Sequence, residues 1–228
     1  GIKNLAIGHS DFLSPIPVLW WRAVGHTQNV FTMETLIDMV AAKAVRDPID
    51  YRLDLLKSGT KREHERFANV IRVVRDFSGW EKGQRRGFAA SFTFGTFLAV
   101  VADVSVAEKE VHIDRIFVAV DCGTAINPDV IKAQIEGGIG YGLSAAIYSE
   151  INFENGAVME SNFPNYETLR INQMPKIDVK IVASAEDPGG IGEPGTPIAA
   201  PALINALYAK TGQRITTLPI SKSGFVFV

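Results

Sequence analysis

The sequence has a single cysteine, Cys122, among its 228 residues. One thiol cannot close an intrachain disulfide, complete a cysteine-based zinc site or hold an iron–sulfur cluster within this chain. Long hydrophobic runs are missing as well, because the most apolar stretch, residues 88–102, is interrupted by serine, threonine and glycine. It falls short of the ~18 residues that a membrane span requires. The sequence therefore predicts no transmembrane segment.

Charge of either sign is also limited. Lys and Arg number 23, and Asp and Glu number 25, which gives a net charge of −2. No basic run favours nucleic acid as a partner, and no acidic run is typical of a solvating tail. With 46% hydrophobic residues, the chain is suited to one large domain or two small ones. It begins without an initiator methionine and reads like the middle of a protein, so we expect a fragment, a processed chain or part of a larger assembly.

The first part of the chain has helical patterns. Apolar residues at three- and four-residue steps predict a helix over residues 30–45. Asp47 and Pro48 have the chemistry of an N-cap and a first helical residue, and Gly59 is suited to end that second helix. A third amphipathic pattern predicts a helix over residues 61–77.

After these helices the hydrophobic period changes to alternation. Residues 92–106 predict one long strand, and residues 111–120 predict a second strand that returns beside it. Antiparallel strands after helices indicate an α+β fold, with mixed or antiparallel sheets and packed helices. We divide the chain accordingly into a helical segment with the Arg22 loop, residues 1–85, and an α+β segment, residues 86–228.

Turn chemistry outlines the second half of the chain. Asn155 and Gly156 predict a hairpin within residues 150–160. Residues 175–182 predict a strand. Gly212 is suited to cap the last helix, and the apolar tail 215–228 is expected to pack back onto the core.

A glycine-rich helix carries the first candidate site residue. Asn127 and Pro128 predict its start, and we expect Gln134 in its first turn, where the amide can donate to an anion or an oxo group. Each glycine costs this helix roughly 0.5–1 kcal/mol relative to alanine. Either a backbone or ligand approaches closely, or the glycines serve helix–helix packing, and both interpretations stay open. The glycines are Gly137, Gly138, Gly140 and Gly142.

An arginine follows two tryptophans near the start of the chain. Trp20 and Trp21 beside Arg22 predict a guanidinium framed by aromatic faces. A buried aromatic anchor next to a surface arginine explains the same spacing equally well.

The stretch Gly-Gly-Ile-Gly-Glu-Pro-Gly, residues 189–195, lies between a predicted strand at 177–182 and a predicted helix at about 198–210. Its glycines allow close approach to the backbone, and Pro194 restricts the chain after Glu193. A carboxylate on such a loop can serve as a general base. The alternative is a tight turn with a solvated glutamate.

The same loop matches the letters of a dinucleotide-binding fingerprint at Gly190, Gly192 and Gly195. That motif also needs an acidic residue about 20 positions further on, for the ribose. The sequence contains no Asp or Glu after Glu193. An NAD-binding domain is therefore disfavoured.

Three blocks, in order, carry a family resemblance. They are Trp-Arg-Ala-Val-Gly-His at 21–26, Gln-Ile-Glu-Gly-Gly at 134–138 and Gly-Ile-Gly-Glu-Pro-Gly at 190–195. Together they resemble the C-terminal part of the large subunit of the molybdenum hydroxylases, the xanthine dehydrogenase and aldehyde oxidase family, in particular the isoquinoline 1-oxidoreductase β-subunit type. The segments Ala200–Ala206 and Leu218–Ile220 extend the resemblance, which covers roughly residues 15–220. It implies the fold of that family's molybdopterin-binding domain.

The resemblance implies a role for each matching residue. Glu193 would be the general base that activates a hydroxyl on molybdenum, with water as the oxygen source and the metal as Lewis acid. The metal would be held by the pterin dithiolene and not by the protein directly. Gln134 would hydrogen-bond an oxo ligand or the pterin, and Arg22 would position substrate or cofactor. The implied cofactor-binding residues are Arg22, Arg52, Gln134, Gly190, Ile191 and Gly192.

The family also implies the cofactor and the partners. We expect molybdenum–molybdopterin, in its cytosine dinucleotide form, with iron–sulfur clusters on a small partner subunit and the remaining cofactor loops on the rest of the molybdopterin subunit. The substrate would be an N-heteroaromatic compound or an aldehyde. A purine is disfavoured, because residues 22–28 differ from the Arg-Gly-Phe-Gly-Gly-Pro-Gln of xanthine-type enzymes. The compartment stays open between the cytoplasmic and the periplasmic side of a bacterial cell.

A non-catalytic subunit or assembly domain that preserves the fold is the alternative. The presence of Glu193, Gln134 and Arg22 together argues against it, because a degenerate copy has no reason to keep all three.

Overall fold

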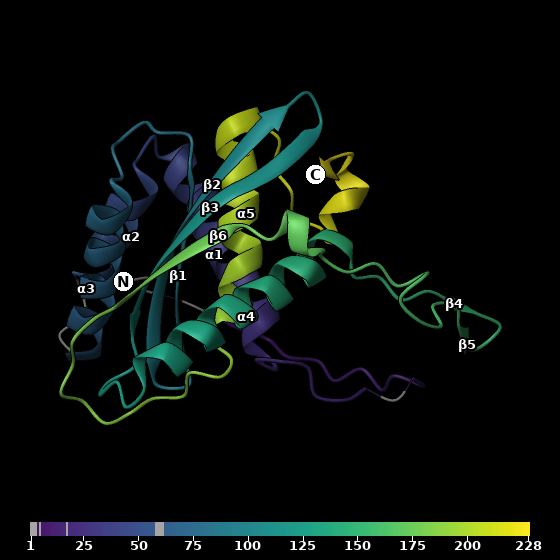
Figure 1. Ribbon diagram of the computed structural model, residues 1–228, viewed down its shortest axis with the longest axis horizontal. Helices are drawn as coiled ribbons and strands as arrows, with labels where there is room; N and C mark the ends of the chain where they lie inside the picture. Colours follow the sequence, from purple (N-terminus) through teal and green to yellow (C-terminus); the bar gives the residue numbers. More distant parts are fainter. Residues whose placement is uncertain (1–3, 5, 17, 58–61) are drawn as a thin grey trace.

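A computed structural model describes residues 4, 6–16, 18–57 and 62–228 (Figure 1). Its helices are α1 (His26–Lys43), α2 (Pro48–Leu56), α3 (Arg62–Ser78), α4 (Pro128–Tyr148) and α5 (Gly195–Thr211), with short 3-10 helices η1 (Ile171–Gln173) and η2 (Ile220–Ser223). Its strands are β1 (Gly87–Thr93), β2 (Thr96–Ala107), β3 (Glu110–Asp121), β4 (Phe153–Glu154), β5 (Ala157–Val158), β6 (Lys176–Ile181) and β7 (Val226–Phe227).

The main sheet is mixed. Strands β1, β2 and β3 are antiparallel neighbours, whereas β6 runs parallel to β3 on its other side. The short C-terminal strand β7 also pairs parallel with β3, at the start of that strand. Helices and a mixed sheet confirm the predicted α+β class.

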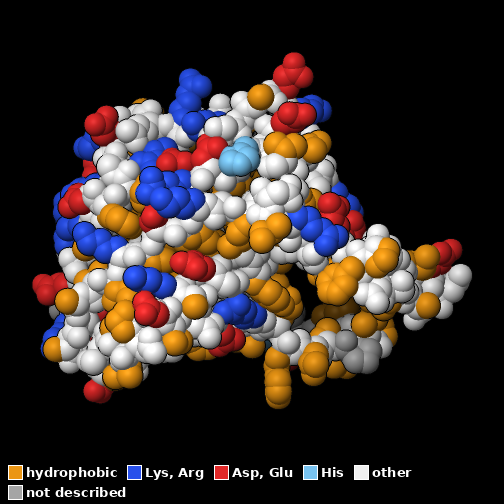
Figure 2. Space-filling view, viewed as in Figure 1, with side chains coloured by type: hydrophobic (Ala, Val, Ile, Leu, Met, Phe, Trp, Pro, Cys, Tyr) orange, Lys and Arg blue, Asp and Glu red, His pale blue; other side chains and the backbone are white. Residues whose placement is uncertain are grey.

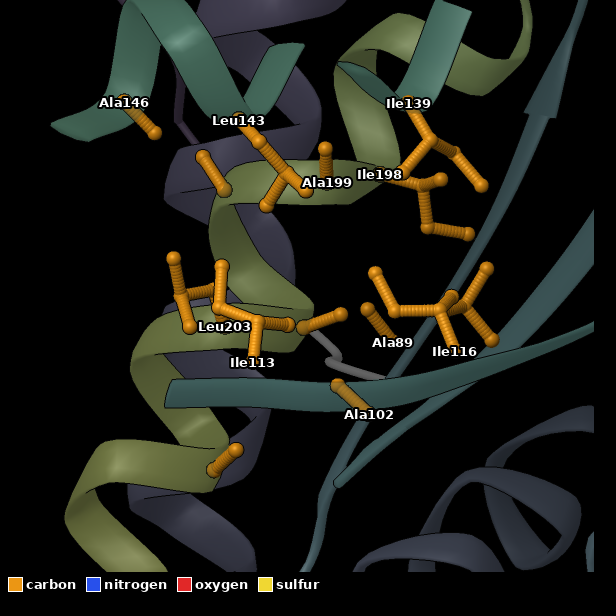
Figure 3. Packing of buried hydrophobic residues seen from close by; sticks show 14 of the residues in the cluster. Ala89, Ala102, Ile113, Ile116, Ile139, Leu143, Ala146, Ile198, Ala199 and Leu203 are labelled. Atoms are coloured by element: carbon orange, nitrogen blue, oxygen red, sulfur yellow. The ribbon is translucent and has the colours of Figure 1, made fainter. Parts of the chain in front are cut away.

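Different helices cover the two faces of the sheet (Figure 1). Helices α4 and α5 lie over one face, and there Ile139 and Leu143 of α4 meet Ile198 and Ala199 of α5 (Figure 3). Helices α2 and α3 lie over the other face, where Ile49, among others, joins a second cluster with strands β1 and β2. This second cluster spans the predicted segment boundary at residues 85 and 86.

The predicted single strand over 92–106 is wrong. The chain turns at Phe94 and Gly95, with φ of +53° and +78°, and pairs Thr93 with Thr96 across a tight hairpin. The turn lacks the Asn-Gly or Asp-Gly signal of such hairpins. Because helices cover both faces of the sheet, β2 is buried at every position from Thr96 to Ala102, so the alternation in the sequence does not show where one strand ends and the next begins.

Several predicted boundaries hold. Asp47 caps α2 by accepting hydrogen bonds from Ile49 N and Asp50 N. The β4–β5 hairpin forms around Asn155 and Gly156, and Gly212 caps α5 at φ +77°. In the predicted tail, Ile215, Ile220, Phe225 and Phe227 are buried. The predicted helix end at Gly59 and helix start at Lys61 lie outside the described residues.

Two helices begin earlier than expected. Helix α1 starts at His26, and α5 starts at Gly195. Pro197 is compatible with the start of α5, because the first-turn N–H groups of a helix have no partner within it. In the described part of the chain, no helix combines the length and the apolar character needed to cross a membrane.

Candidate functional site

The glycine loop between β6 and α5 rests on the β1–β2 turn. Gly189 N donates to Cys122 O at 2.8 Å, Gly190 N donates to Phe94 O at 2.7 Å, and Thr96 Oγ1 donates to Gly190 O at 2.7 Å. A Cβ on Gly189 would lie 2.7 Å from a backbone oxygen, and one on Gly190 would lie 2.9 Å from the Phe94 side chain. These two glycines are therefore required for packing.

Gly192 differs from the other glycines of this loop. No heavy atom lies within 4 Å of the position that a Cβ would occupy there. Ile191, next to it, packs partly buried against the main core. Of the backbone predicted to face a cofactor, Gly192 is the part that borders open space, while Gly190 is turned toward the hairpin.

The Arg22 side chain joins this loop to α4. Its Nε donates to Gly192 O at 3.0 Å, and Nη2 donates to Gln134 Oε1 at 3.0 Å and also contacts Gly192 O. The guanidinium lies 5.9 Å from the ring centre of Tyr141, whose ring contacts that of Trp21 at 4.8 Å. The predicted aromatic framing thus comes mainly from Tyr141.

The Glu193 carboxylate is held by the backbone next to Arg22. Ala23 N donates to Glu193 Oε1 at 2.9 Å. No hydrogen bond reaches the other oxygen, Oε2, from the residues that the structure describes. Arg22, Ala23, Gln134, Gly192 and Glu193 form one contact group, which we call the site cluster.

The backbone at Ala23 and Val24 is strained. Their φ angles are +71° and +41°, although neither residue is glycine and valine is β-branched. Left-handed conformations at such residues cost of order 1–3 kcal/mol each and concentrate at functional sites. Val24 N closes the turn by donating to Trp21 O at 2.8 Å. This turn aims the Ala23 N–H at Glu193.

A close crossing of α4 and α5 brings Gln134 to the loop. A Cβ on Gly138 would lie 3.1 Å from Gly195, and one on Gly142 would lie 2.5 Å from Thr196 O. Thr196 Oγ1 also donates to Gly138 O at 3.1 Å. Helix–helix packing therefore explains Gly138 and Gly142.

The other two glycines of α4 have different neighbours. A Cβ on Gly137 would find only Arg22 Nη1, at 4.0 Å, and one on Gly140 would meet the Met174 side chain. The expectation that Gln134 lies in the first turn is wrong, because α4 begins at Pro128 and Gln134 sits nearly two turns into it. Contact with the loop, and not the helix terminus, determines its place in the site.

Arg52 lies elsewhere in the fold. Its Nε donates to Glu34 Oε2 at 2.9 Å, and Nη1 donates to Pro48 O at 3.0 Å, with the Phe88 ring beneath the guanidinium. Glu34 also accepts from Ala90 N at 2.7 Å. Burial raises the pKa of Glu34, and the charge of Arg52 opposes this shift. The structure does not bring Arg52 to the site cluster.

Two members of the site were missed from the sequence. Tyr141 lies seven residues after Gln134, a spacing that places both on one helix face and was available as a signal. Ala23 contributes only a backbone N–H, which no side-chain pattern reveals. Burial raises the pKa of the Tyr141 hydroxyl.

A cavity opens next to the site cluster. Its volume is about 470 Å³, and it is bordered by Trp21, Gly137, Tyr141 and Met174, among others. Figure 2 shows acidic and basic side chains interspersed over the main body, whereas hydrophobic side chains gather on the part that projects from it. Within the described residues, no group of three or more His, Cys, Asp or Glu side chains is arranged to hold a metal ion.

Residues 25–175 match the family model described as the molybdopterin cofactor-binding domain. The chain belongs to this family. The resemblance to the molybdenum hydroxylases that its motifs carry is confirmed.

Curated relatives agree with this assignment. The chain is 33% identical over 222 residues to the β-subunit of isoquinoline 1-oxidoreductase from Brevundimonas diminuta, an alignment that covers 92% of the chain and 28% of the relative. It is 30% identical over 227 residues to the membrane-bound aldehyde dehydrogenase [pyrroloquinoline-quinone] of Gluconacetobacter polyoxogenes, covering 88% and 29%. It is 28% identical over 243 residues to one of the subunits of nicotinate dehydrogenase from Pseudomonas putida, covering 96% and 20%. The chain thus spans less than a third of the length of these relatives.

The site cluster of this molybdopterin-binding domain fits such a cofactor. Gln134 Nε2 and Arg22 Nη1 are N–H donors that have no acceptor among the described residues. Both side chains belong to the contact group that includes Gly192, whose Cβ position borders open space. Amide and guanidinium donors suit the oxo, pterin and phosphate oxygens of a molybdopterin group.

Proposed function

We propose that this domain contributes the general base and part of the cofactor contact of a molybdenum-dependent hydroxylase, which oxidises an N-heteroaromatic compound or an aldehyde. The observation that carries the proposal is the contact of Ala23 N with Glu193 Oε1, which holds one carboxylate oxygen and leaves the other without a partner among the described residues. A general base needs this combination of fixed position and a free lone pair.

The backbone around Glu193 fixes the place of its carboxylate. The residue lies next to Pro194, which is the N-cap of α5. The N–H of Ala23 donates a hydrogen bond to Oε1. Glu193 can therefore accept a proton at Oε2 while Oε1 stays anchored.

Gln134, Arg22 and the Gly192 backbone would hold the cofactor. When bound, molybdenum–molybdopterin supplies a Lewis acid and an acceptor of two electrons. Gln134 would donate from Nε2 to an acceptor oxygen of that group, while Arg22 holds the oxygen end of the same amide. The open face of Gly192 would allow the cofactor to approach the backbone.

The cofactor form and the partners belong to the same proposal. We infer the cytosine dinucleotide form, the remainder of a molybdopterin subunit that supplies the other cofactor contacts, and an iron–sulfur partner that removes electrons. The partner is needed because one cysteine cannot hold a cluster. Two of the relatives are themselves named as subunits, and the three are named for isoquinoline, an aldehyde and nicotinate, which supports the substrate class.

The test is Glu193→Gln in the holoenzyme that contains this chain. We expect turnover of isoquinoline, nicotinate or acetaldehyde to fall by at least the 10²–10⁴-fold that acid–base catalysis typically contributes, while the molybdenum content stays unchanged. Glu136→Gln, at an exposed glutamate of helix α4 outside the site cluster, is the matched control and should remain active.

Two outcomes would contradict the proposal. A nearly normal rate in Glu193→Gln refutes the base assignment. A wild-type complex that contains neither molybdenum nor pterin supports a fold-preserving subunit without catalysis.

A further inference from the structure

We propose that Arg22 is a positioning residue, which sets the direction of the Gln134 amide and the place of Glu193 and does not bind the reacting molecule. The inference rests on the proposed function. It concerns how three segments that are distant in the sequence act as one unit.

The chemistry of the guanidinium determines how Gln134 is oriented. Arginine carries only donors, so the end of the amide that faces Arg22 Nη2 at 3.0 Å must be the oxygen. The amide nitrogen of Gln134 then points away from Arg22. Both of its N–H groups stay available for a ligand, since none is used within the described part of the chain. Without Arg22, the amide could rotate and present its oxygen to the ligand instead.

Arg22 and Ala23 also hold the glycine loop at two adjacent residues, Gly192 and Glu193. The Arg22 side chain bonds the carbonyl of Gly192, and the N–H of Ala23 bonds the side chain of Glu193. These hydrogen bonds between two pairs of neighbouring residues restrict both translation and rotation of the loop. We call this arrangement the Arg22–Ala23 clamp.

The guanidinium itself is well constrained. It lies beside the Tyr141 ring, and Gly137 leaves room for it on the surface of α4. Its Nε and Nη2 atoms serve acceptors on two different segments, the loop and α4. A lysine ammonium is a single point donor without a planar fork, so it could not reproduce the Nε and Nη2 bonds together.

A double-mutant cycle in the holoenzyme tests the inference. The variants are Arg22→Met, Gln134→Met and the double variant, with kcat and KM measured on isoquinoline. Misplacement of a reacting group by about 1 Å can cost on the order of 10²-fold in rate, so we expect each single variant to lose about this much in kcat. If Arg22 acts through Gln134, the kcat of the double variant should be no more than about threefold below the kcat of the slower single variant. The reason is that the effects of coupled residues on the free energy are not additive.

Independent roles predict a different result. Losses that multiply to about 10⁴-fold would show that Arg22 contacts the reactants separately and would overturn the inference. The electron paramagnetic resonance spectrum of the molybdenum gives a second measurement. We expect similar shifts in Arg22→Met and Gln134→Met, whereas an unchanged spectrum in Arg22→Met contradicts the positioning role.

Two further variants serve as a substitute for Arg22→Met and as a control. Arg22→Lys should recover part of the lost rate, and it replaces Arg22→Met in the cycle if the methionine variant does not fold. Arg85→Met, at an exposed arginine before β1, is the control and should match wild type. Absence of molybdenum and turnover in the wild-type complex would refute the proposed function itself, whereas an active wild type with multiplicative losses refutes only the role of Arg22.

Discussion

Replacing Arg52 with methionine should destabilise the protein without changing the chemistry of the site cluster. Arg52 is 4% exposed and forms an ion pair with Glu34, which is 6% exposed, between α1, α2 and β1. The resemblance to molybdenum hydroxylases implies an active-site role for this arginine, whereas its contacts in the fold are those of a core ion pair. The two interpretations predict different results for one variant.

The structure indicates a large loss of stability. Removing one partner of a buried ion pair leaves a buried charge without compensation and typically costs about 3–5 kcal/mol. The contact of Arg52 with the Phe88 ring, at 5.1 Å, adds to the loss by about 0.5–2 kcal/mol. A methionine of similar length refills part of the volume, so we expect a total decrease near the lower end, about 3–4 kcal/mol at neutral pH.

The loss should depend on pH. Burial raises the pKa of Glu34 from 4.5, and Arg52 is the strongest opposing influence, so the methionine variant should raise it further. A carboxyl with a raised pKa in the folded state binds its proton more tightly there than in the unfolded state. Its stabilising effect is present below the unfolded pKa and is lost as pH rises through the folded pKa. The deficit of Arg52→Met should therefore be larger at pH 8 than at pH 5.

Urea unfolding followed by circular dichroism measures the free energy of unfolding at both pH values. The double variant Arg52→Met/Glu34→Gln should recover most of the loss, because a neutral amide needs no counter-charge and still accepts from Ala90 N. Arg46→Met is the control and should change stability little, because solvent screens its exposed pair with Asp54. If Arg52→Met kept wild-type stability at pH 8 but lost turnover with molybdenum bound, the core-pair interpretation would be wrong.

Two further predictions concern the α4–α5 crossing and the end of β3. Gly142→Ala should lower stability by about 1–3 kcal/mol and reduce turnover, because its Cβ would lie 2.5 Å from Thr196 O and force the helices apart. Gly137→Ala should not be destabilised, and equal melting temperatures for the two variants would contradict the packing argument. Burial disfavours the charge of Asp121, but the hydrogen bonds that it accepts, from Arg66 first, outweigh this and hold its pKa below the usual range. Its stabilising effect is therefore present at neutral pH and lost as pH falls through the folded pKa. Asp121→Asn should lower the free energy of unfolding by about 1.5–3 kcal/mol at pH 7 and flatten the acid side of its pH profile. An unchanged pH profile would refute this.

Much of the fold could be predicted where a local signal exists. Asp47 caps a helix through its own side chain, and Asn155 with Gly156 turns a hairpin by its own backbone preference. The β1–β2 turn at Phe94 and Gly95 was missed, because its sequence lacks that preference and both faces of the strands are buried. A hydrophobic pattern indicates which face of a strand or helix is covered by other residues. It is uninformative for a strand that is covered on both faces.

For the site, the chemical groups could be predicted from the sequence: a carboxylate between glycines, an amide on a glycine-rich helix and arginines in two motifs. Which of these groups meet depends on the fold. Arg22 reaches Gly192 and Gln134, whereas Arg52 is held in the core by Glu34. Likewise, Gly190 packs against the β1–β2 turn while Gly192 borders open space. The reason is that the contacts of Arg22 join residues more than a hundred positions apart. Strand pairing and the α4–α5 crossing bring these residues together, and no local spacing encodes that.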